Sequence, residues 1–141
     1  MRVLFDTNVV LDVLLDREPF VTPAAYLFSR VEQGALNGLL CATTITTIHY
    51  LASRVVGKER AQEEIVKLLA LFEIAPVTRT VLETALARGF SDFEDAVMHE
   101  AARHADVQAL VTRNAKDFQK ASLTVYSPTD LVRALTTLRL S

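Results

Sequence analysis

Short apolar runs alternate with longer amphipathic stretches along this chain, and the two patterns predict strands and helices in turn. The first run, residues 2–5 (RVLF), ends at Asp6 and has the length of a buried strand. Four further runs predict strands at residues 39–42, 74–77, 108–112 and 123–126. Because helical stretches separate the runs, we expect an α/β fold, a three-layer α/β/α sandwich around a mostly parallel sheet of about five strands.

Capping residues and prolines predict where the intervening helices begin and end. Asn8 stands where the N-cap of the first helix is expected, and Gly34, Gly57 and Gly89 stand where three later helices stop. Pro23 and Pro128 fit the first turn of a helix, where proline is tolerated. The first predicted helix follows Asn8. The later ones run from Thr22 to Gly34, from Thr43 or Thr44 to Val56, from Lys58 to Phe72, from Thr80 to Arg88, from Ser91 or Asp92 to about His104, and from Ser127 to about Leu138.

The composition fits a single domain over residues 1–141. Half of the 141 residues are apolar and 23% are charged, which excludes a disordered chain. No apolar run reaches the roughly 18 residues of a membrane span, and Asp6 interrupts the N-terminal apolar stretch that a secretory signal would need. The one cysteine, Cys41, excludes intramolecular disulfides and cysteine-based zinc sites, and its apolar strand predicts a core position. We therefore expect a soluble cytoplasmic protein.

The net charge of −2 argues against a dedicated basic nucleic-acid binder. It leaves open an enzyme that meets a phosphodiester through bound cations. No GxGxxG or P-loop pattern is present, so nothing in the sequence predicts a dinucleotide or ATP site.

Acidic residues stand at three places where the predicted sheet would bring them together. Asp6 directly follows the first strand, Asn114 and Asp117 follow the fourth, and Asp92 and Asp95 lie three residues apart at the start of a helix. Ligands of parallel α/β sheets bind beyond the carboxyl ends of the strands, so these side chains are candidates for one site. Each also has an ordinary interpretation as a helix cap, a first-turn charge or a solvated loop residue.

Converging carboxylates repel one another, and a divalent cation removes that repulsion. Oxygen-only ligands indicate Mg²⁺ or Mn²⁺ rather than Zn²⁺. A water bound to such a cation can attack phosphorus, so the arrangement fits metal-dependent phosphodiester hydrolysis.

Other polar residues predict less chemistry. His49, His99 and His104 lack metal-ligand spacing apart from a weak pair at 99 and 104, and we expect His99 and His104 to be exposed or half-buried. Arg113 could reach a phosphate, although a single loop arginine is usually solvated.

Three segments in this order resemble the PIN domain family. They are VLFDTNVV from Val3, DFEDA from Asp92 and LVTRNAKDF from Leu110, and the resemblance spans essentially the whole chain. It implies a parallel sheet flanked by helices and an Mg²⁺- or Mn²⁺-dependent ribonuclease. Small bacterial members are commonly VapC-like toxins of type II toxin–antitoxin pairs, so the resemblance also implies an RNA substrate, a homodimer and a small antitoxin. The DFED segment resembles one subgroup.

The resemblance assigns the four aspartates to the metal and three polar residues to their support. The metal and catalytic set is Asp6, Asp92, Asp95 and Asp117; the supporting set is Asn8, Thr112 and Asn114. His49 departs from the family, because many of these toxins have Glu at that position of the third helix, and we expect it to be a bystander or an outer neighbour of the site.

The main prediction is therefore a toxin-type endoribonuclease, and the alternative is a catalytically weak or inactive PIN-fold module that binds RNA or protein. A haloacid-dehalogenase-type phosphatase is disfavoured because it needs Asp at the position of Asn8. The apolar faces of the third helix and of residues 58–72 fit either an ordinary core or a symmetric homodimer, and the resemblance to the PIN domain family favours the homodimer. In the third helix these apolar positions are Ile45, Ile48, Leu51 and Val55.

Overall fold

The computed structural model describes residues 1–140 and contains a five-stranded parallel sheet. The order across the sheet is β3-β2-β1-β4-β5, and all four neighbouring pairs run parallel. The strands are β1 (Arg2–Phe5), β2 (Asn37–Cys41), β3 (Glu73–Ala75), β4 (Ala109–Val111) and β5 (Thr124–Tyr126). The predicted mostly parallel sheet of about five strands is thus confirmed.

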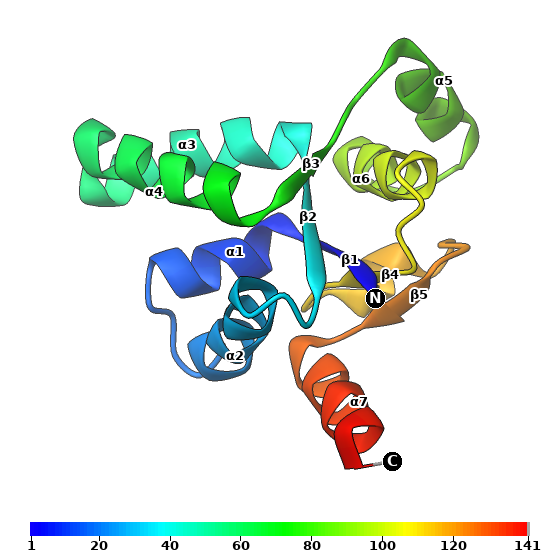
Figure 1. Cartoon of the computed structure of the whole chain (residues 1–141). Helices are drawn as coiled ribbons and strands as arrows, with labels where there is room; N and C mark the ends of the chain where they lie inside the picture. The colour runs from blue at the N-terminus through cyan, green and yellow to red at the C-terminus, as the bar shows by residue number, and fades with distance from the viewer. Residues whose placement is uncertain (141) are drawn as a thin grey trace.

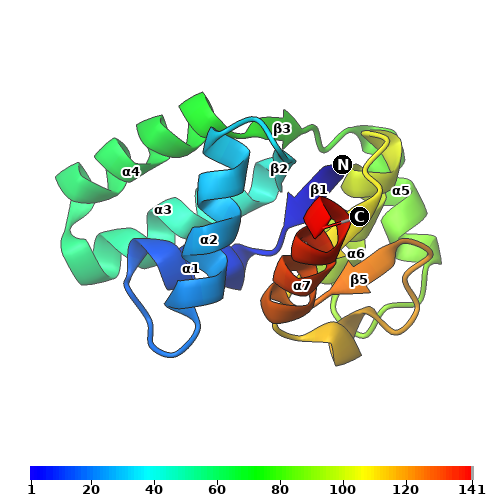
Figure 2. The ribbon, with the colours of Figure 1, turned by 60° about the horizontal axis from the view of Figure 1, so that its bottom comes forward.

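Helices cover both faces of this sheet (Figure 1). One face packs against α1 (Thr7–Leu14), α2 (Val21–Glu32), α3 (Ala42–Val56), α4 (Lys58–Leu71) and α7 (Pro128–Leu140). The other packs against α5 (Arg79–Ala87) and α6 (Phe93–His104), and a short 3₁₀ turn, η1 (Ala115–Phe118), follows β4. Figure 2 shows α2 beside α7, which closes the first layer. Within the described residues, none of the helices is long and apolar enough to span a membrane.

Alternation along β1 divides the core in two. Val3 and Phe5 contribute to the core under α1, α2, α4 and α7, whereas Leu4 contributes to the core under α5 and α6. In the first core Phe5, Phe28 and Phe72 meet edge to face, with ring centroids 5.2–5.8 Å apart.

Several helix starts differ from the prediction by one or two residues, and two of these helices directly follow a strand. The helix α1 begins at Thr7, and Asp6 rather than Asn8 occupies its N-cap, because the Asp6 carbonyl accepts the Val9 N–H at 3.0 Å while its own backbone stays extended. The helix α3 begins at Ala42, directly after β2, earlier than the predicted Thr43 or Thr44. The predicted cap at Asp92 and the stop at Gly57, whose φ is 89°, are confirmed.

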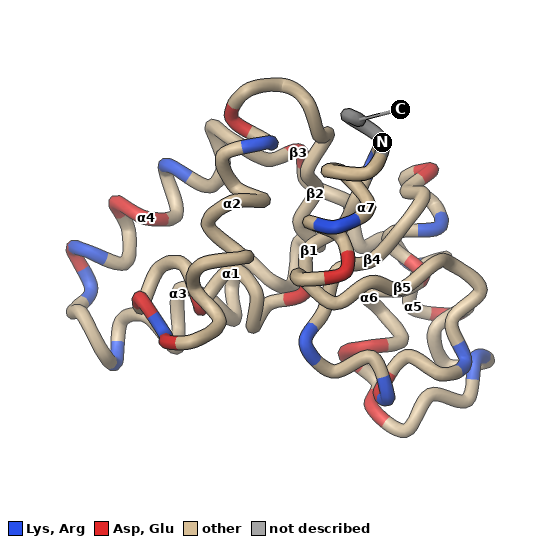
Figure 3. The backbone as a smooth tube through the Cα atoms, turned by 90° about the horizontal axis from the view of Figure 1, so that it is seen from below, with Lys and Arg blue, Asp and Glu red and all other residues tan. Residues whose placement is uncertain are grey.

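Acidic and basic residues follow one another along α4 and are interspersed over the rest of the backbone (Figure 3). This distribution agrees with the net charge of −2.

Candidate active site

Asp6 stands at the centre of the candidate site. It follows β1, its side chain is only 8% exposed, and its backbone N–H donates to the Val111 carbonyl of β4 at 2.9 Å. Burial raises the pKa of the Asp6 carboxyl above its ordinary value, and the charges of Glu94 and Asp117 raise it further, against the hydrogen bonds from Thr112 and Thr7. The sheet therefore holds a carboxyl at the end of β1 in surroundings that disfavour its negative charge.

Thr112 connects the ends of β1 and β4. Its buried hydroxyl donates to Asp6 Oδ2 at 2.7 Å and accepts the backbone N–H of Asn114 at 3.0 Å. The structure thus places Thr112 in contact with Asp6, the position expected of a residue that orients this carboxylate. Asn114 reaches this arrangement through its backbone, and its N-cap position leads into the turn that carries Asp117.

The start of α6 supplies the remaining acids. Asp92 Oδ1 accepts the Asp95 N–H at 3.0 Å, so this carboxylate caps the helix. The pKa of Asp95 rises to about 7, first through burial and then through the charges of Asp92, Asp6, Asp117 and Glu94. Carboxylates from three segments of the chain therefore act on one another at the carboxyl edge of the sheet.

Sequence reasoning missed Glu94, which affects both Asp6 and Asp95. Its Oε1 accepts a hydrogen bond from the Thr47 hydroxyl of α3 at 3.3 Å. Its place inside the DFED segment was the available signal, but helical spacing favoured Asp92 and Asp95 as the pair on one face.

These acids form an oxygen-only donor set, which matches the chemistry of Mg²⁺ or Mn²⁺. Among the described residues, however, no three His, Cys, Asp or Glu side chains come together closely enough to hold a metal ion. Two oxygens already accept hydrogen bonds, Asp6 Oδ2 from Thr112 and Asp92 Oδ1 from the Asp95 N–H, and carboxylates that carry charge without a cation repel one another. The donor chemistry and the repulsion fit a divalent cation, and the carboxylates must turn inward to bind it.

Asn8 and His49 take less part in this arrangement. Asn8 is the second residue of α1 and is half-buried. His49 is half-buried in α3, and the hydrogen bond found at this residue goes from the Ser53 hydroxyl to its backbone carbonyl. Thr47, two residues earlier, donates a hydrogen bond to Glu94. Through this bond α3 contacts the acidic cluster, which consists of Asp6, Asp92, Glu94, Asp95 and Asp117.

His99 is fully buried, so the prediction that it is exposed or half-buried is wrong. Its Nδ1 lies 2.6 Å from the buried carboxylate of Glu100, and its Nε2 accepts the Ser122 N–H at 3.0 Å. The proton of the neutral ring is therefore on Nδ1. Burial lowers the pKa of His99, with Arg88 and Arg103 acting in the same direction and Glu100 opposing them.

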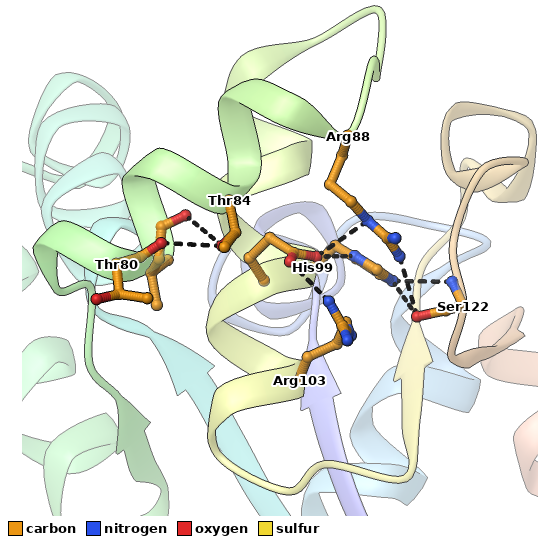
Figure 4. A network of polar contacts seen from close by, with 8 residues as sticks. Thr80, Thr84, Arg88, His99, Arg103 and Ser122 are labelled. Carbon is orange, nitrogen blue, oxygen red and sulfur yellow. Dashed lines mark hydrogen bonds and ion pairs between the residues drawn. The ribbon is translucent and has the colours of Figure 1, made fainter.

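The carboxylate of Glu100 contacts His99 and two arginines. Arg88 Nε lies 3.2 Å from Oε2, and Arg103 Nη1 donates to Oε1 at 2.8 Å. Burial would raise the pKa of Glu100, but the His99 hydrogen bond and the two arginines outweigh it and lower the pKa. In Figure 4 Arg88, Arg103 and Ser122 converge around His99. Through Ser122, the network fastens to α6 the segment that comes after η1. It therefore connects η1, which carries Asp117, with α6, which carries Asp95.

Arg113 is neither free nor simply solvated. Its guanidinium donates to the buried Asp12 carboxylate, from Nε at 2.7 Å and from Nη2 at 3.2 Å.

Known proteins resemble this chain in sequence and in fold. A family model described as "PIN domain" matches residues 2–116. The chain is 22% identical over 142 residues to "Ribonuclease VapC1" of Aquifex aeolicus (strain VF5), covering 97% of each chain. It resembles the "Toxin-antitoxin complex from Klebsiella pneumoniae" with a TM-score of 0.68 and 21% identity, covering 89% of this chain and 97% of that one. The TM-score is 0.62, with 16% identity, for the Mycobacterium tuberculosis "VapC20 (Rv2549c), Sarcin-Ricin loop cleaving toxin", covering 77% of this chain and 86% of that one.

Proposed function

Because this chain belongs to the PIN domain family, we propose that it is an endoribonuclease that depends on Mg²⁺ or Mn²⁺. The observation that carries the proposal is that acids from three segments influence one another at one edge of the sheet, where burial first and their mutual repulsion second raise the pKa values of Asp6 and Asp95. A protein without a cation gains nothing from such crowding. The likeness to a curated ribonuclease over 97% of both chains supports RNA as the substrate.

The chain's own residues divide the work of this site. Asp6 and Asp95, with Asp117 from the β4 loop, would hold the cation, and Asp92 would add charge while it caps α6. A bound divalent cation supplies an activated water and neutralises charge that develops on the phosphate. Thr112 orients the Asp6 carboxylate through its 2.7 Å hydrogen bond. His49 stays outside this set.

We also propose that the protein is the toxin of a type II toxin–antitoxin pair, a single cytoplasmic domain of the DFED-type subgroup. The likeness to a toxin–antitoxin complex along 89% of this chain supports a small antitoxin as its partner.

A homodimer is part of the same proposal. Ile48 belongs to the core, so it drops out of the expected interface, but Leu51 and Val55 of α3 are exposed, as are Val66 and Leu69 of α4. The two helices lie side by side, so these side chains offer apolar surface on neighbouring elements. Light scattering should report twice the mass of 15.6 kDa, and a value of 15.6 kDa at high concentration would exclude the dimer.

The test of the activity is cleavage of a structured RNA by the wild-type protein and by Asp95→Asn during a titration with Mn²⁺. We expect Mn²⁺-dependent cleavage that Asp95→Asn abolishes. Asp130→Asn, which removes an exposed acid from the first turn of α7, is the control and should cleave normally. RNA binding without cleavage at any Mn²⁺ concentration would instead establish the inactive PIN-fold module.

A further inference from the structure

A pocket of about 650 Å³ opens at the carboxyl edge of the sheet, apart from the acidic cluster. One wall comes from the end of the α1–α2 connection and the start of α2, with Pro19, Phe20 and Pro23. The other comes from Arg113, directly after β4, and from residues 127–129, directly after β5. A volume of this size is within the range of small-ligand sites, about 300–1,000 Å³.

The Arg113 guanidinium is held rigidly in the wall of this pocket. Both Asp12 oxygens accept from it, at 2.7 and 3.2 Å, and Asp12 is fully buried. The guanidinium carbon lies 3.9 Å from the centroid of the Phe20 ring, and Phe20 is 38% exposed. The cation and the aromatic ring are stacked and together form a platform at the pocket, in which the Phe20 ring is the more exposed part.

Arg113 belongs to an ion-pair group that contains more positive than negative side chains. Asp12 pairs with two arginines, because Arg17 Nε also lies 3.7 Å from its Oδ1. One carboxylate against two guanidiniums leaves this ion-pair group a net charge of one positive unit, and Asp16 and Glu18 flank Arg17 in the sequence. In the part of the chain that the structure describes, the hydrogen bonds of Arg113 use Nε and Nη2, which leaves Nη1 for a ligand.

A single residue, Thr112, connects the platform to the acidic cluster along the chain. Arg113 directly follows Thr112, whose hydroxyl donates to Asp6, and the chain reaches Asp117 four residues later. A polyanion is repelled by the acids when no cation is bound, so the positive charge beside them offers it a point of attachment. This charge arrangement favours a phosphate-bearing ligand over an acidic or apolar peptide.

We propose that this pocket binds one nucleotide of single-stranded RNA, close along the strand to the phosphate that is cleaved. The base stacks on the Phe20–Arg113 platform, and a phosphate pairs with the remaining Arg113 donor. The proposal rests on the proposed ribonuclease function and names a substrate subsite for it.

The first experiment uses tryptophan fluorescence. The chain contains no Trp, so Phe20→Trp introduces a single fluorophore into the pocket. The variant is made in the Asp95→Asn background and titrated, in Mg²⁺, with an unstructured oligoribonucleotide of about ten nucleotides, within the usual site size for single strands. We expect saturable quenching. Tyr50→Trp in the same background is the matched control, because Tyr50 pairs with Arg54 at 5.6 Å on exposed α3, outside the pocket, and should show no quenching.

The second experiment uses Phe20→Leu in the active protein, which removes the aromatic face and keeps apolar volume. We expect KM for an RNA substrate to rise about 5- to 150-fold, the range for loss of one stacked base, with kcat and Tm unchanged. Tyr50→Leu should leave KM unchanged. A lower Tm with an unchanged KM would mean that Phe20 only packs, and would overturn the subsite.

The outcomes separate the two proposals. If wild-type protein cleaves RNA and Asp95→Asn does not, but quenching and the KM change are both absent, the nucleotide subsite is wrong and the ribonuclease function stands. If wild-type protein does not cleave, the ribonuclease function fails, whereas saturable quenching of Phe20→Trp would still establish nucleotide binding at the platform. Quenching that is equal for Tyr50→Trp would show unspecific association and overturn the subsite.

Discussion

Replacing Asp95 by Asn removes one negative charge from the acidic cluster and is expected to stabilise the metal-free protein at neutral and alkaline pH. The pKa of this carboxyl is 3.8 in a free chain and about 7 in the folded protein. A raised folded-state pKa means that the folded protein keeps the proton to higher pH than the unfolded chain does. Its stability therefore falls as the pH rises above the unfolded value, and the loss is complete above the folded value.

The size of the effect follows from this shift. About three pKa units, at 1.36 kcal/mol each, would be about 4 kcal/mol for a carboxyl shielded from water. Asp95 is only half-buried, so solvent screening reduces the figure to about 1–2 kcal/mol. Asn also loses the favourable interaction of a charge with the helix N-terminus, about 0.3–0.5 kcal/mol. The remaining gain of about 0.5–1.7 kcal/mol corresponds to a rise in Tm of about 2–6 °C.

The assay is thermal unfolding followed by circular dichroism, with a metal chelator and low salt, at about pH 4 and about pH 8. We expect Asp95→Asn to come close to the wild-type protein at the lower pH, where the folded carboxyl is neutral and the unfolded one is about half ionised, and to exceed it by more at the higher pH. Asp130→Asn is the matched control, because Asp130 is the third residue of α7 and its N–H donates to Ser127 Oγ at 3.1 Å, as the Asp95 N–H donates to Asp92. Its side chain is 61% exposed.

Two results would refute this reasoning. A gain in Tm that is equal at both pH values would mean that Asp95 acts through packing or helix propensity instead of charge. An equal gain in Tm from Asp130→Asn at the higher pH would mean that any acid in the first turn of a helix has this effect. The crowding of acids at the carboxyl edge of the sheet would then not be its cause.

Three further predictions concern the same region. Mn²⁺ at millimolar concentration should raise the Tm of the wild-type protein, and Asp6→Asn should blunt the rise; an unchanged wild-type Tm would count against a clustered site. His49→Ala should change Mn²⁺ affinity in calorimetry only slightly, whereas His49→Glu should tighten it by adding a carboxylate; a loss with His49→Ala as large as with Asp95→Asn would make His49 a site residue. Glu100→Gln should lower the free energy of unfolding by about 2–3 kcal/mol in urea, because it leaves two arginines without their shared carboxylate, and a loss below about 0.5 kcal/mol would show that the network is dispensable.

Local patterns were sufficient to predict the sheet and to bring the candidate site residues to one of its edges. A run such as residues 2–5 is apolar on both faces, and β1 is buried on both faces between two helical layers. Asp6 and Thr112 are 106 residues apart, yet their contact follows from two parallel strands that end at the same edge. Helix ends were predicted where a single residue sets the backbone, as Gly57 and Asp92 do.

Burial on α6 could not be read from periodicity. Seven consecutive residues, Ala96–Ala102, are buried, because α5, the sheet and the segment after η1 enclose the helix on several sides. An amphipathic pattern predicts one buried face, so His99 was expected to be exposed or half-buried, and nothing in the sequence marked Glu100 as buried. Their burial depends on Ser122 and Arg88, which only the assembled fold brings to them.

The ion pair of Asp12 with Arg113 shows what sequence patterns leave out and why it matters for function. The two residues are 101 positions apart, and in the sequence each is an isolated charge. Their meeting requires the register that sets Phe5 of β1 beside Val111 of β4. Burying a carboxylate gives little net stability compared with an apolar side chain of similar size, since desolvation offsets the attraction. Core packing alone would therefore be served as well by leucine at position 12. What a carboxylate adds is a fixed orientation for the Arg113 guanidinium against Phe20, and an arginine held in one plane beside an acidic cluster is suited to receive a phosphate and a base.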